Sequence, residues 1–279
     1  MIDKPAGMTS HDVVDRVRRG LGTKKVGHAG TLDPDATGLL VIGVGRATRL
    51  LSYAQQTPKR YRGVARFGIT TTTQDASGEI TNRRPSSVTR TELEGALGKF
   101  IGEIKQVPPM VSAVKVGGER LYKKARRGEE IERAPRAVTV YALSVIEFDS
   151  SEQTAELDIT CSAGTYVRTL VHDIGEDLGC GAHLVALRRT ENAGFVVADA
   201  ISLDDVDSTR LRPLIDAVRA LRTVEVDETD ARLVATGRPL APPDDVMDGE
   251  AVALSRTGTL LAVYRRDGET LLPDRVLAR

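Results

Sequence analysis

The segment 27–38 places one carboxylate, Asp33, between glycines and a proline in a run without helical or strand periodicity. Gly30 and Gly38 permit backbone conformations that a side chain would forbid, and Pro34 fixes its own φ. The proline also pushes Asp33 toward an extended conformation. A carboxylate held in this way can serve as a nucleophile or a general base. The structural alternative is a helix start, because Asp is a favoured N-cap and Pro a favoured first helical residue.

The residues around Asp33 resemble the central motif of the TruB family of tRNA pseudouridine synthases, G-H-x-G-T-L-D-P-x-A-x-G-x-L, which this chain satisfies from Gly27 through Leu40. Six further segments similar to that family stand in the same order along residues 1–195. They are D-K-P-A-G-M-T-S from Asp3, K-R-Y-R-G from Lys59, Q-V-P-P from Gln106, S-A-V-K from Ser112, C-S-A-G-T-Y-V-R-T-L from Cys161 and A-L-R-R from Ala186.

The reaction that this resemblance implies breaks the bond between N1 of uracil and C1′, turns the base and rejoins it through C5, without a redox cofactor or a metal. The resemblance implies that Asp33 is the catalytic carboxylate, either as a nucleophile or as a base at C2′, and the residues leave both routes open. It also implies that Arg168 pairs with Asp33 and that Tyr61 stacks on the everted uracil, where the hydroxyl could assist proton removal from C5. The alternatives are a surface arginine near a helix start and an ordinary strand aromatic.

Other residues bind the substrate by the same resemblance. His28 would fill the space that the flipped base leaves in the T loop, Lys4 and Pro5 would wall the pocket, and Leu187 would give it an apolar side. The remaining expected substrate-binding residues are Gly30, Thr31, Lys59, Arg60 and Tyr166. Arg188 and Arg189 could contact phosphates or lie in solvent.

The composition restricts the classes of partner. Lys plus Arg and Asp plus Glu both total 39, so the net charge is zero and binding to RNA must depend on local basic clusters. Cys161, His172, Cys180 and His183 lack the spacing of usual metal ligands, and the two cysteines are expected to be buried and reduced. We therefore expect no metal, no membrane segment and a cytoplasmic protein. The resemblance further implies no cofactor and the T stem-loop of tRNA as the partner, for which a monomer would suffice.

The element pattern predicts an α+β fold, which by resemblance is a mixed, largely antiparallel central sheet flanked by helices. Thr9 or Ser10 begins a helix, a capping box at 89–92 begins another, and a third covers 165–178. Strands are expected at 39–44, 61–67, 138–148 and 154–161, with a further helix at 47–55. We expect one domain over 1–222 and a small β-rich domain over 223–279. The resemblance implies that the first is the catalytic domain with an RNA-clamping insertion at about 108–136, and that the second is PUA-like.

Strand runs in that second domain are expected at 251–254, 260–264 and 276–277. The resemblance begins almost at Met1, so either the first strand is shortened or the start site is misassigned. The predicted substrate is uridine 55 in the T loop of elongator tRNAs. The alternatives are a subunit that depends on a guide RNA and a tRNA-folding module without catalysis. A metal or nucleotide enzyme is disfavoured, since the chain contains neither a dinucleotide motif nor a P-loop.

Overall fold

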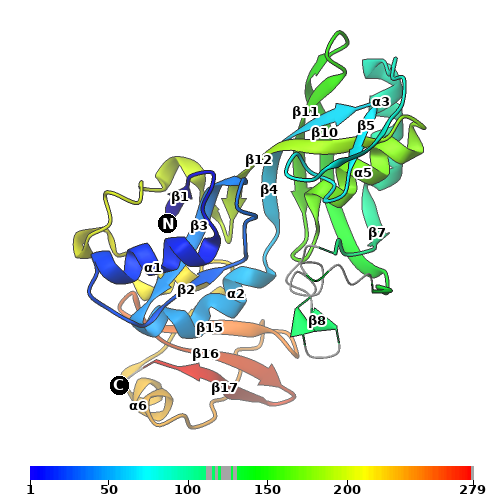
Figure 1. Cartoon of the computed structure of the whole chain (residues 1–279). Coiled ribbons are helices and arrows are strands. Elements are labelled where there is room, and N and C mark those ends of the chain that lie inside the picture. The colour runs from blue at the N-terminus through cyan, green and yellow to red at the C-terminus, as the bar shows by residue number, and fades with distance from the viewer. Residues whose placement is uncertain (111–114, 117–118, 121–126, 128–130, 278–279) are drawn as a thin grey trace.

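The computed structural model describes residues 1–110, 115–116, 119–120, 127 and 131–277. In this part of the chain a nine-stranded sheet forms the centre of the molecule, with seven strands in the order β1-β3-β12-β4-β11-β10-β7 (Figure 1). Its strands are β1 (Ile2–Lys4), β3 (Thr37–Val44), β12 (Ala182–Asn192), β4 (Lys59–Phe67), β11 (Thr154–Cys161), β10 (Arg136–Asp149) and β7 (Gly102–Gln106), with β2 (Val26–Ala29) on β3 and β13 (Phe195–Val196) on β12. Only the β12–β3 pair is parallel among these described strands, which confirms the predicted mixed, largely antiparallel sheet.

The predicted helix starts are confirmed. Thr9 caps α1 (Ser10–Gly20) in a capping box with Asp12, and Thr89 caps α3 (Arg90–Leu97) in the same way with Glu92. The helix predicted at 47–55 begins as a 3₁₀ turn, Gly45–Leu50, before α2 (Leu51–Gln56). The helix predicted from 165 begins two residues later, as α5 (Val167–Asp177).

Apolar side chains of α5 cover the central sheet. Leu170, Val171 and Ile174 are buried against strands β4 and β11, and Leu157 and Ile159 lie in the same cluster. Helix α1 makes a second cluster, in which its valines pack against Leu40 and Val26. Each large apolar side chain that is buried stabilises the fold by about 1.5–3 kcal/mol. These two clusters therefore support the loops between them.

The C-terminal part of the chain forms a separate four-stranded sheet in the order β14-β15-β16-β17. Its elements are β14 (Arg222–Glu225), α6 (Glu228–Ala235), β15 (Ala251–Arg256), β16 (Thr259–Asp267) and β17 (Thr270–Val276). The strands predicted at 251–254 and 260–264 are confirmed. The strand predicted at 276–277 instead runs over β17 and contains Pro273, which is tolerated because β17 is an edge strand.

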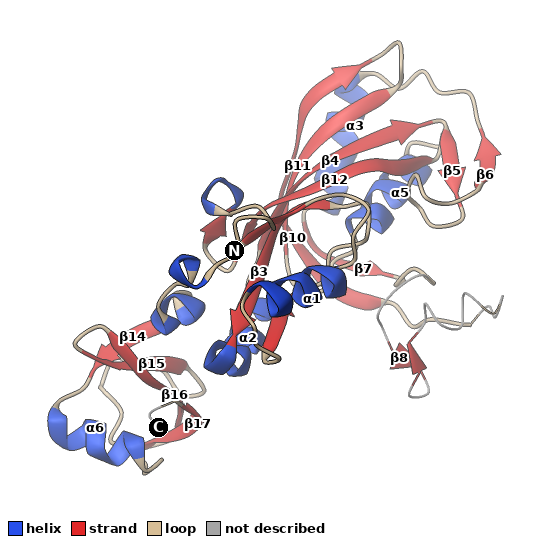
Figure 2. Ribbon diagram, turned by 60° about the vertical axis from the view of Figure 1, so that its left-hand side comes forward, coloured by secondary structure: helices blue, strands red, loops and turns tan. Residues whose placement is uncertain are grey.

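The two sheets are joined through α2 and its preceding 3₁₀ turn. Leu50 and Tyr53 pack against a cluster that contains Ala253 and Val263, and the Tyr53 hydroxyl donates to Asp274 Oδ2 at 2.8 Å. Figure 2 shows the C-terminal sheet with α6 on the side that faces away from α2. The second sheet therefore packs directly against the element that precedes β4.

Smaller elements complete the described residues. β5 (Ile69–Thr71) and β6 (Ile80–Arg83) form a hairpin beside α5, and β8 (Lys115–Val116) pairs with β9 (Glu119–Arg120). Further 3₁₀ turns lie at Gly98–Phe100, Val197–Asp199, Ser208–Arg210 and Leu214–Val218. Most of the insertion predicted at about 108–136, including Tyr122, lies outside the described residues. Within the residues that are described, no helix combines the length and the apolar character needed to cross a membrane.

Candidate active site

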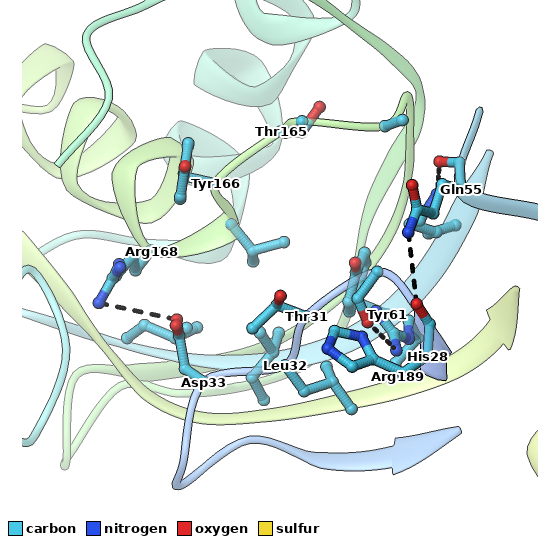
Figure 3. A pocket seen from close by; sticks show the side chains of 17 residues that line it. His28, Thr31, Leu32, Asp33, Gln55, Tyr61, Thr165, Tyr166, Arg168 and Arg189 are labelled. Carbon is cyan, nitrogen blue, oxygen red and sulfur yellow. Dashed lines mark hydrogen bonds and ion pairs between the residues drawn. The ribbon is translucent and has the colours of Figure 1, made fainter. Parts of the chain in front are cut away.

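A cavity of about 400 Å³ lies where the loop after β2 meets strands β4 and β12 and the start of α5 (Figure 3). It brings together segments that are far apart in the sequence. The lining residues are His28, Gly30, Thr31, Leu32, Asp33, Gln55, Lys59, Tyr61, Ala163, Gly164, Thr165, Tyr166, Val167, Arg168, Leu184, Leu187 and Arg189. The cavity therefore contains nine of the twelve residues expected at the site, and Lys4, Pro5 and Arg60 are not among its lining residues.

The loop that carries Asp33 is a tight turn and not a helix start. The Ala36 N–H donates to the Asp33 carbonyl at 3.1 Å, and the chain then enters β3 at Thr37. Gly38 has φ +98°, and a Cβ there would lie 2.3 Å from the Arg189 carbonyl oxygen. The backbone of this loop can therefore approach β12 only because position 38 is glycine. The helix-cap alternative for Asp33 is wrong.

Lys4 lies beneath this loop and not in the wall of the cavity. Its side chain is fully buried, and its Nζ donates to the carbonyls of Met8 at 2.6 Å, Pro34 at 2.7 Å and Pro5 at 2.8 Å. The expectation that Lys4 and Pro5 wall the pocket is corrected, because the three carbonyls draw the ammonium under the turn while Pro5 is exposed. Lys4 instead fixes the residue that follows Asp33.

The burial of Lys4 predicts a change in stability with pH. Desolvation lowers the pKa of Lys4 from 10.5 to about 8, although Asp35 and Asp33 oppose the shift. Between these two values the unfolded chain binds more protons, so this lysine makes the free energy of unfolding rise with pH over that interval. We expect Lys4→Met to make the rise in urea titrations between pH 7.5 and 10 less steep, with the rise due to Lys59, whose pKa is also lowered to about 8, retained. The exposed Lys24→Met serves as the control, and parallel curves for wild type and Lys4→Met would contradict the expectation.

Asp33 faces the guanidinium of Arg168 across the cavity. Asp33 Oδ2 lies 3.6 Å from Arg168 Nη1, and the arginine side chain is only 4% exposed whereas that of Asp33 is 47% exposed. Desolvation raises the pKa of Asp33, the positive charge of Arg168 lowers it, and nearby Asp75 raises it again. The net pKa lies above the ordinary value, so the ionised form of Asp33 depends on the arginine beside it.

Asp75, in the turn between β5 and β6, holds Arg168 in this position. Its Oδ2 accepts a hydrogen bond from Arg168 Nη1 at 3.0 Å, and its Oδ1 accepts from the hydroxyls of Thr73 and Ser77, each at 2.6 Å. Burial raises the pKa of Asp75, but these hydrogen bonds outweigh it and the net pKa is lowered. Sequence reasoning missed Asp75, because its partner is 93 residues away and no local pattern marks the pair.

Tyr61 and Arg189 lie directly opposite each other on β4 and β12. Arg189 is 1% exposed and its guanidinium bonds to the Tyr61 hydroxyl (Figure 3). Burial raises the pKa of Tyr61, and the charge of Arg189 opposes that rise. The expectation that Arg189 contacts phosphate or lies in solvent is wrong, because strand alternation turns it inward beside Tyr61. Arg188 faces the other way and pairs with Asp3 at 2.6 Å.

The other expected residues differ in their placement. Lys59 is buried in the cavity wall and donates to the carbonyls of Gln55 at 2.8 Å and Thr57 at 2.6 Å, and desolvation lowers its pKa to about 8. Arg60 lies on the opposite face of β4, where it bonds to Asp158 at 2.6 Å and to Glu191 at 3.0 Å. Its expected place at the pocket is corrected for that reason.

The cavity wall beside Arg168 is fixed by Gln106, a residue of the Q-V-P-P segment. Gln106 is buried; its Oε1 accepts from the Tyr166 N–H at 3.0 Å and its Nε2 donates to the Tyr166 carbonyl at 3.3 Å. The Arg168 guanidinium lies 6.0 Å from the centre of the Tyr166 ring. Gln106 therefore positions the residue that precedes α5.

The His and Cys residues do not form a ligand cluster. Cys161 and Cys180 are free and buried as expected, and burial raises the pKa of Cys161 to about 11. His183 contacts the Ile69 carbonyl at 3.0 Å. Among the described residues no group of three or more His, Cys, Asp or Glu side chains is placed to hold a metal ion.

His28 lines the cavity next to Thr31 and Tyr61, and its carbonyl accepts from Gln55 Nε2 at 3.3 Å. Desolvation lowers the pKa of His28, with further lowering from the charges of His11 and Arg189. The imidazole is therefore neutral near pH 7, and its buried Nδ1 has no partner among the described residues.

Comparison with known proteins gives two family matches. Residues 18–167 match the TruB family pseudouridylate synthase N-terminal domain, and residues 168–226 match the tRNA pseudouridylate synthase B C-terminal domain. Proteins named tRNA pseudouridine synthase B are similar to this chain. The one from Ralstonia pickettii is 42% identical and covers 99% of this chain and 93% of its own, and the one from Thermobifida fusca is 47% identical and covers 87% and 86%.

A solved structure described as a Cbf5-Nop10-Gar1 complex contains a chain with a similar fold. The TM-score is 0.79 at 27% sequence identity, and the alignment covers 99% of this chain and 83% of that one. The likeness extends over both sheets, because nearly the whole chain is aligned.

Proposed function

The chain belongs to the TruB family of pseudouridylate synthases and is a tRNA pseudouridine synthase, and from this premise we propose that its target is uridine 55 in the T loop of elongator tRNAs. The single observation that supports the proposed site best is the placement of Asp33 3.6 Å from the buried Arg168, in a cavity that also contains Tyr61. A cavity of about 400 Å³ has room for one everted nucleotide.

In the proposed mechanism Asp33 acts on the sugar of the everted uridine. As an anion it either bonds to the nucleoside or removes the proton at C2′, and in both routes the N1–C1′ bond breaks. Arg168 keeps the carboxylate ionised once RNA covers the cavity, because desolvation alone favours the neutral acid. Enclosure by the RNA also protects the detached uracil from water and from loss.

Tyr61, His28 and Leu187 would bind the base. The ring of Tyr61 offers a stacking face, and Leu187 supplies an apolar side of the cavity. We propose that His28 fills the space vacated in the T loop, which suits a neutral imidazole at the cavity mouth. Lys59 and Thr31, with Gly30 and Tyr166, complete the wall on the loop and helix sides.

Substitutions at Tyr61 separate its ring from its hydroxyl. We expect Tyr61→Phe to retain tRNA binding but to react roughly a hundredfold more slowly, the usual scale of proton-transfer catalysis. Tyr61→Leu should lose both binding and catalysis, because the stacking face is also removed. Filter binding and single-turnover rates give the two quantities. Tyr141→Phe, on an exposed strand position, is the control, and full activity of both Tyr61 variants would refute the assignment.

The remaining parts of the proposal concern organisation. We propose a monomer that acts on the T stem-loop in the cytoplasm, where bacterial tRNA is matured. The domains would cover 1–222 and 223–279, with the insertion at about 108–136 clamping the RNA and a PUA-like second domain. A separate core around Val252 and Tyr264 supports this division, although the first strand of the second sheet, β14, already begins at Arg222.

A subunit that depends on a guide RNA is the second candidate, supported by the shared fold with the chain in the Cbf5-Nop10-Gar1 complex. The higher identity to proteins named tRNA pseudouridine synthase B favours the stand-alone enzyme. The test is to incubate the purified chain alone with an unmodified tRNA transcript and map pseudouridine. A transcript with cytidine at position 55 is the control. If product forms only after a guide RNA or partner proteins are added, the second candidate is favoured. If the chain refolds tRNA but forms no product, the tRNA-folding module is favoured.

A further inference from the structure

A buried cation lies directly behind the Tyr61 hydroxyl. Arg189 is 1% exposed, and Nε donates to the Leu39 carbonyl at 2.7 Å while Nη2 donates to the Gly30 carbonyl at 3.1 Å. A further hydrogen bond joins its guanidinium to the Tyr61 side chain. These partners are two carbonyls and a phenol, which carry no full charge, and no ion pair of Arg189 occurs among the described residues.

Burying the Arg189 guanidinium without a carboxylate partner costs folding free energy, because a buried arginine normally pairs with a carboxylate. A role at the site would explain why this cost is tolerated. The neighbourhood is already positive, since the Lys59 ammonium lies close enough for Arg189 to lower its pKa. The tertiary structure nevertheless holds the guanidinium rigidly, through strands β12 and β3 and the loop at Gly30. The Gly30 loop is in van der Waals reach of the guanidinium, because a Cβ at Gly30 would lie 3.6 Å from Arg189 Nη1.

We propose that Arg189 is a positioning residue for the C5 step, holding the Tyr61 oxygen toward the uracil and stabilising negative charge on that oxygen. After C1′ bonds to C5, the C5–H bond must break and its electron pair must restore the C5–C6 double bond. The Tyr61 hydroxyl gives its proton to water, the phenolate oxygen so formed takes the C5 proton, and N1 gains a proton from water. A fixed guanidinium stabilises the phenolate character that develops on the way.

Geometry supports this role over one in RNA binding. Arg189 and Tyr61 are cross-strand partners on one face of the sheet, so their side chains must lie together. Burial raises the pKa of Tyr61, and the charge of Arg189 lowers it. A lower pKa favours the phenolate, which is the form of Tyr61 that accepts a proton. A surface arginine, by contrast, would meet phosphates without touching the phenol.

The test is a double-mutant cycle of Arg189→Lys and Tyr61→Phe in the full chain, with single-turnover rates at saturating tRNA. We expect Arg189→Lys to slow the reaction roughly tenfold to a hundredfold, and to add less than about twofold in the Tyr61→Phe background, because both act on one step. Arg62→Lys, next to Tyr61 but on the exposed face of β4, is the matched control and should leave the rate unchanged.

A second readout separates this role from a structural one. With tRNA transcribed from 5-deuterated UTP, we expect a larger isotope effect on the rate for Arg189→Lys than for wild type or Arg62→Lys. If Arg189→Lys does not fold, Arg189→Gln, which keeps donors for the two carbonyls, replaces it in both measurements. Additive rate effects, or an isotope effect equal to that of wild type, would overturn the inference and assign Arg189 to support of the Gly30 loop.

The inference rests on the proposed role of Tyr61, and the cycle distinguishes the two failures. Full activity of Tyr61→Phe would refute the role of Tyr61 and the inference with it. Loss of activity in Tyr61→Phe, together with an independent effect of Arg189→Lys, would refute the inference alone.

Discussion

The Asp33→Asn variant should form pseudouridine at least about a thousandfold more slowly than wild type, because the amide can neither bond to the nucleoside nor remove a proton from C2′. Its shape is nearly unchanged, and the turn is held by the backbone bond from Ala36 and by Lys4 beneath Pro34. The variant should therefore fold normally. It should bind tRNA as tightly as wild type or more tightly, since one negative charge is removed from a site for RNA.

The control for this prediction is Asp35→Asn, an exposed aspartate two residues further along the same turn. We expect it to retain the wild-type rate. Single-turnover assays should follow pseudouridine itself, and binding should be measured on the same preparations. An Asp33→Asn protein that still converts uridine at a comparable rate would remove Asp33 from the chemistry and reopen the alternative of a tRNA-folding module.

Loss of Arg168 has the second largest expected effect. In Arg168→Met the positive charge beside Asp33 is gone, so desolvation and Asp75 raise the pKa of Asp33 further above its ordinary value. We expect the rate to fall by roughly a hundredfold or more at neutral pH. The reactive form is the anion, so activity is lost as pH falls through the pKa of Asp33. The acid limb of the pH–rate profile should therefore move to higher pH in the variant.

Stability must be separated from chemistry in this experiment, because Asp75 would lose its charged partner and keep only the hydrogen bonds from Thr73 and Ser77. Removal of one partner of a buried pair costs about 3–5 kcal/mol, and the partial exposure of Asp75 makes the cost smaller here. The double variant Arg168→Met with Asp75→Asn should recover much of that free energy of unfolding while remaining inactive. Arg90→Met, on the surface of α3, is the control. Recovery of activity together with stability, or an unmoved acid limb in Arg168→Met, would show that Arg168 has only a structural role.

Local chemistry explains which expectations were confirmed. The starts of α1 and α3 follow from capping boxes that span four residues, and the strand predicted at 61–67 lies within β4. The resemblance in the first 195 residues identified the family and the reaction class. These features need no knowledge of how distant segments meet, which is why the printed sequence was enough.

The corrections concern contacts between distant segments. Lys4 reaches a carbonyl 30 residues away, Arg168 bonds to Asp75 across 93 residues, and Arg189 turns inward beside Tyr61. Each depends on strand register or on the path of a turn, and a register shift of one residue would send the side chain to the other face.

The sequence by itself thus determined the helix starts, because capping preferences act within a few residues, and its resemblance to the TruB motifs identified the family and the reaction. Only the tertiary structure showed that Arg189 lies beside Tyr61 and that Asp75 holds Arg168 next to Asp33. The physical reason is that burial and Coulomb forces depend on distance in space, which β4, β12 and α5 set when they pack together.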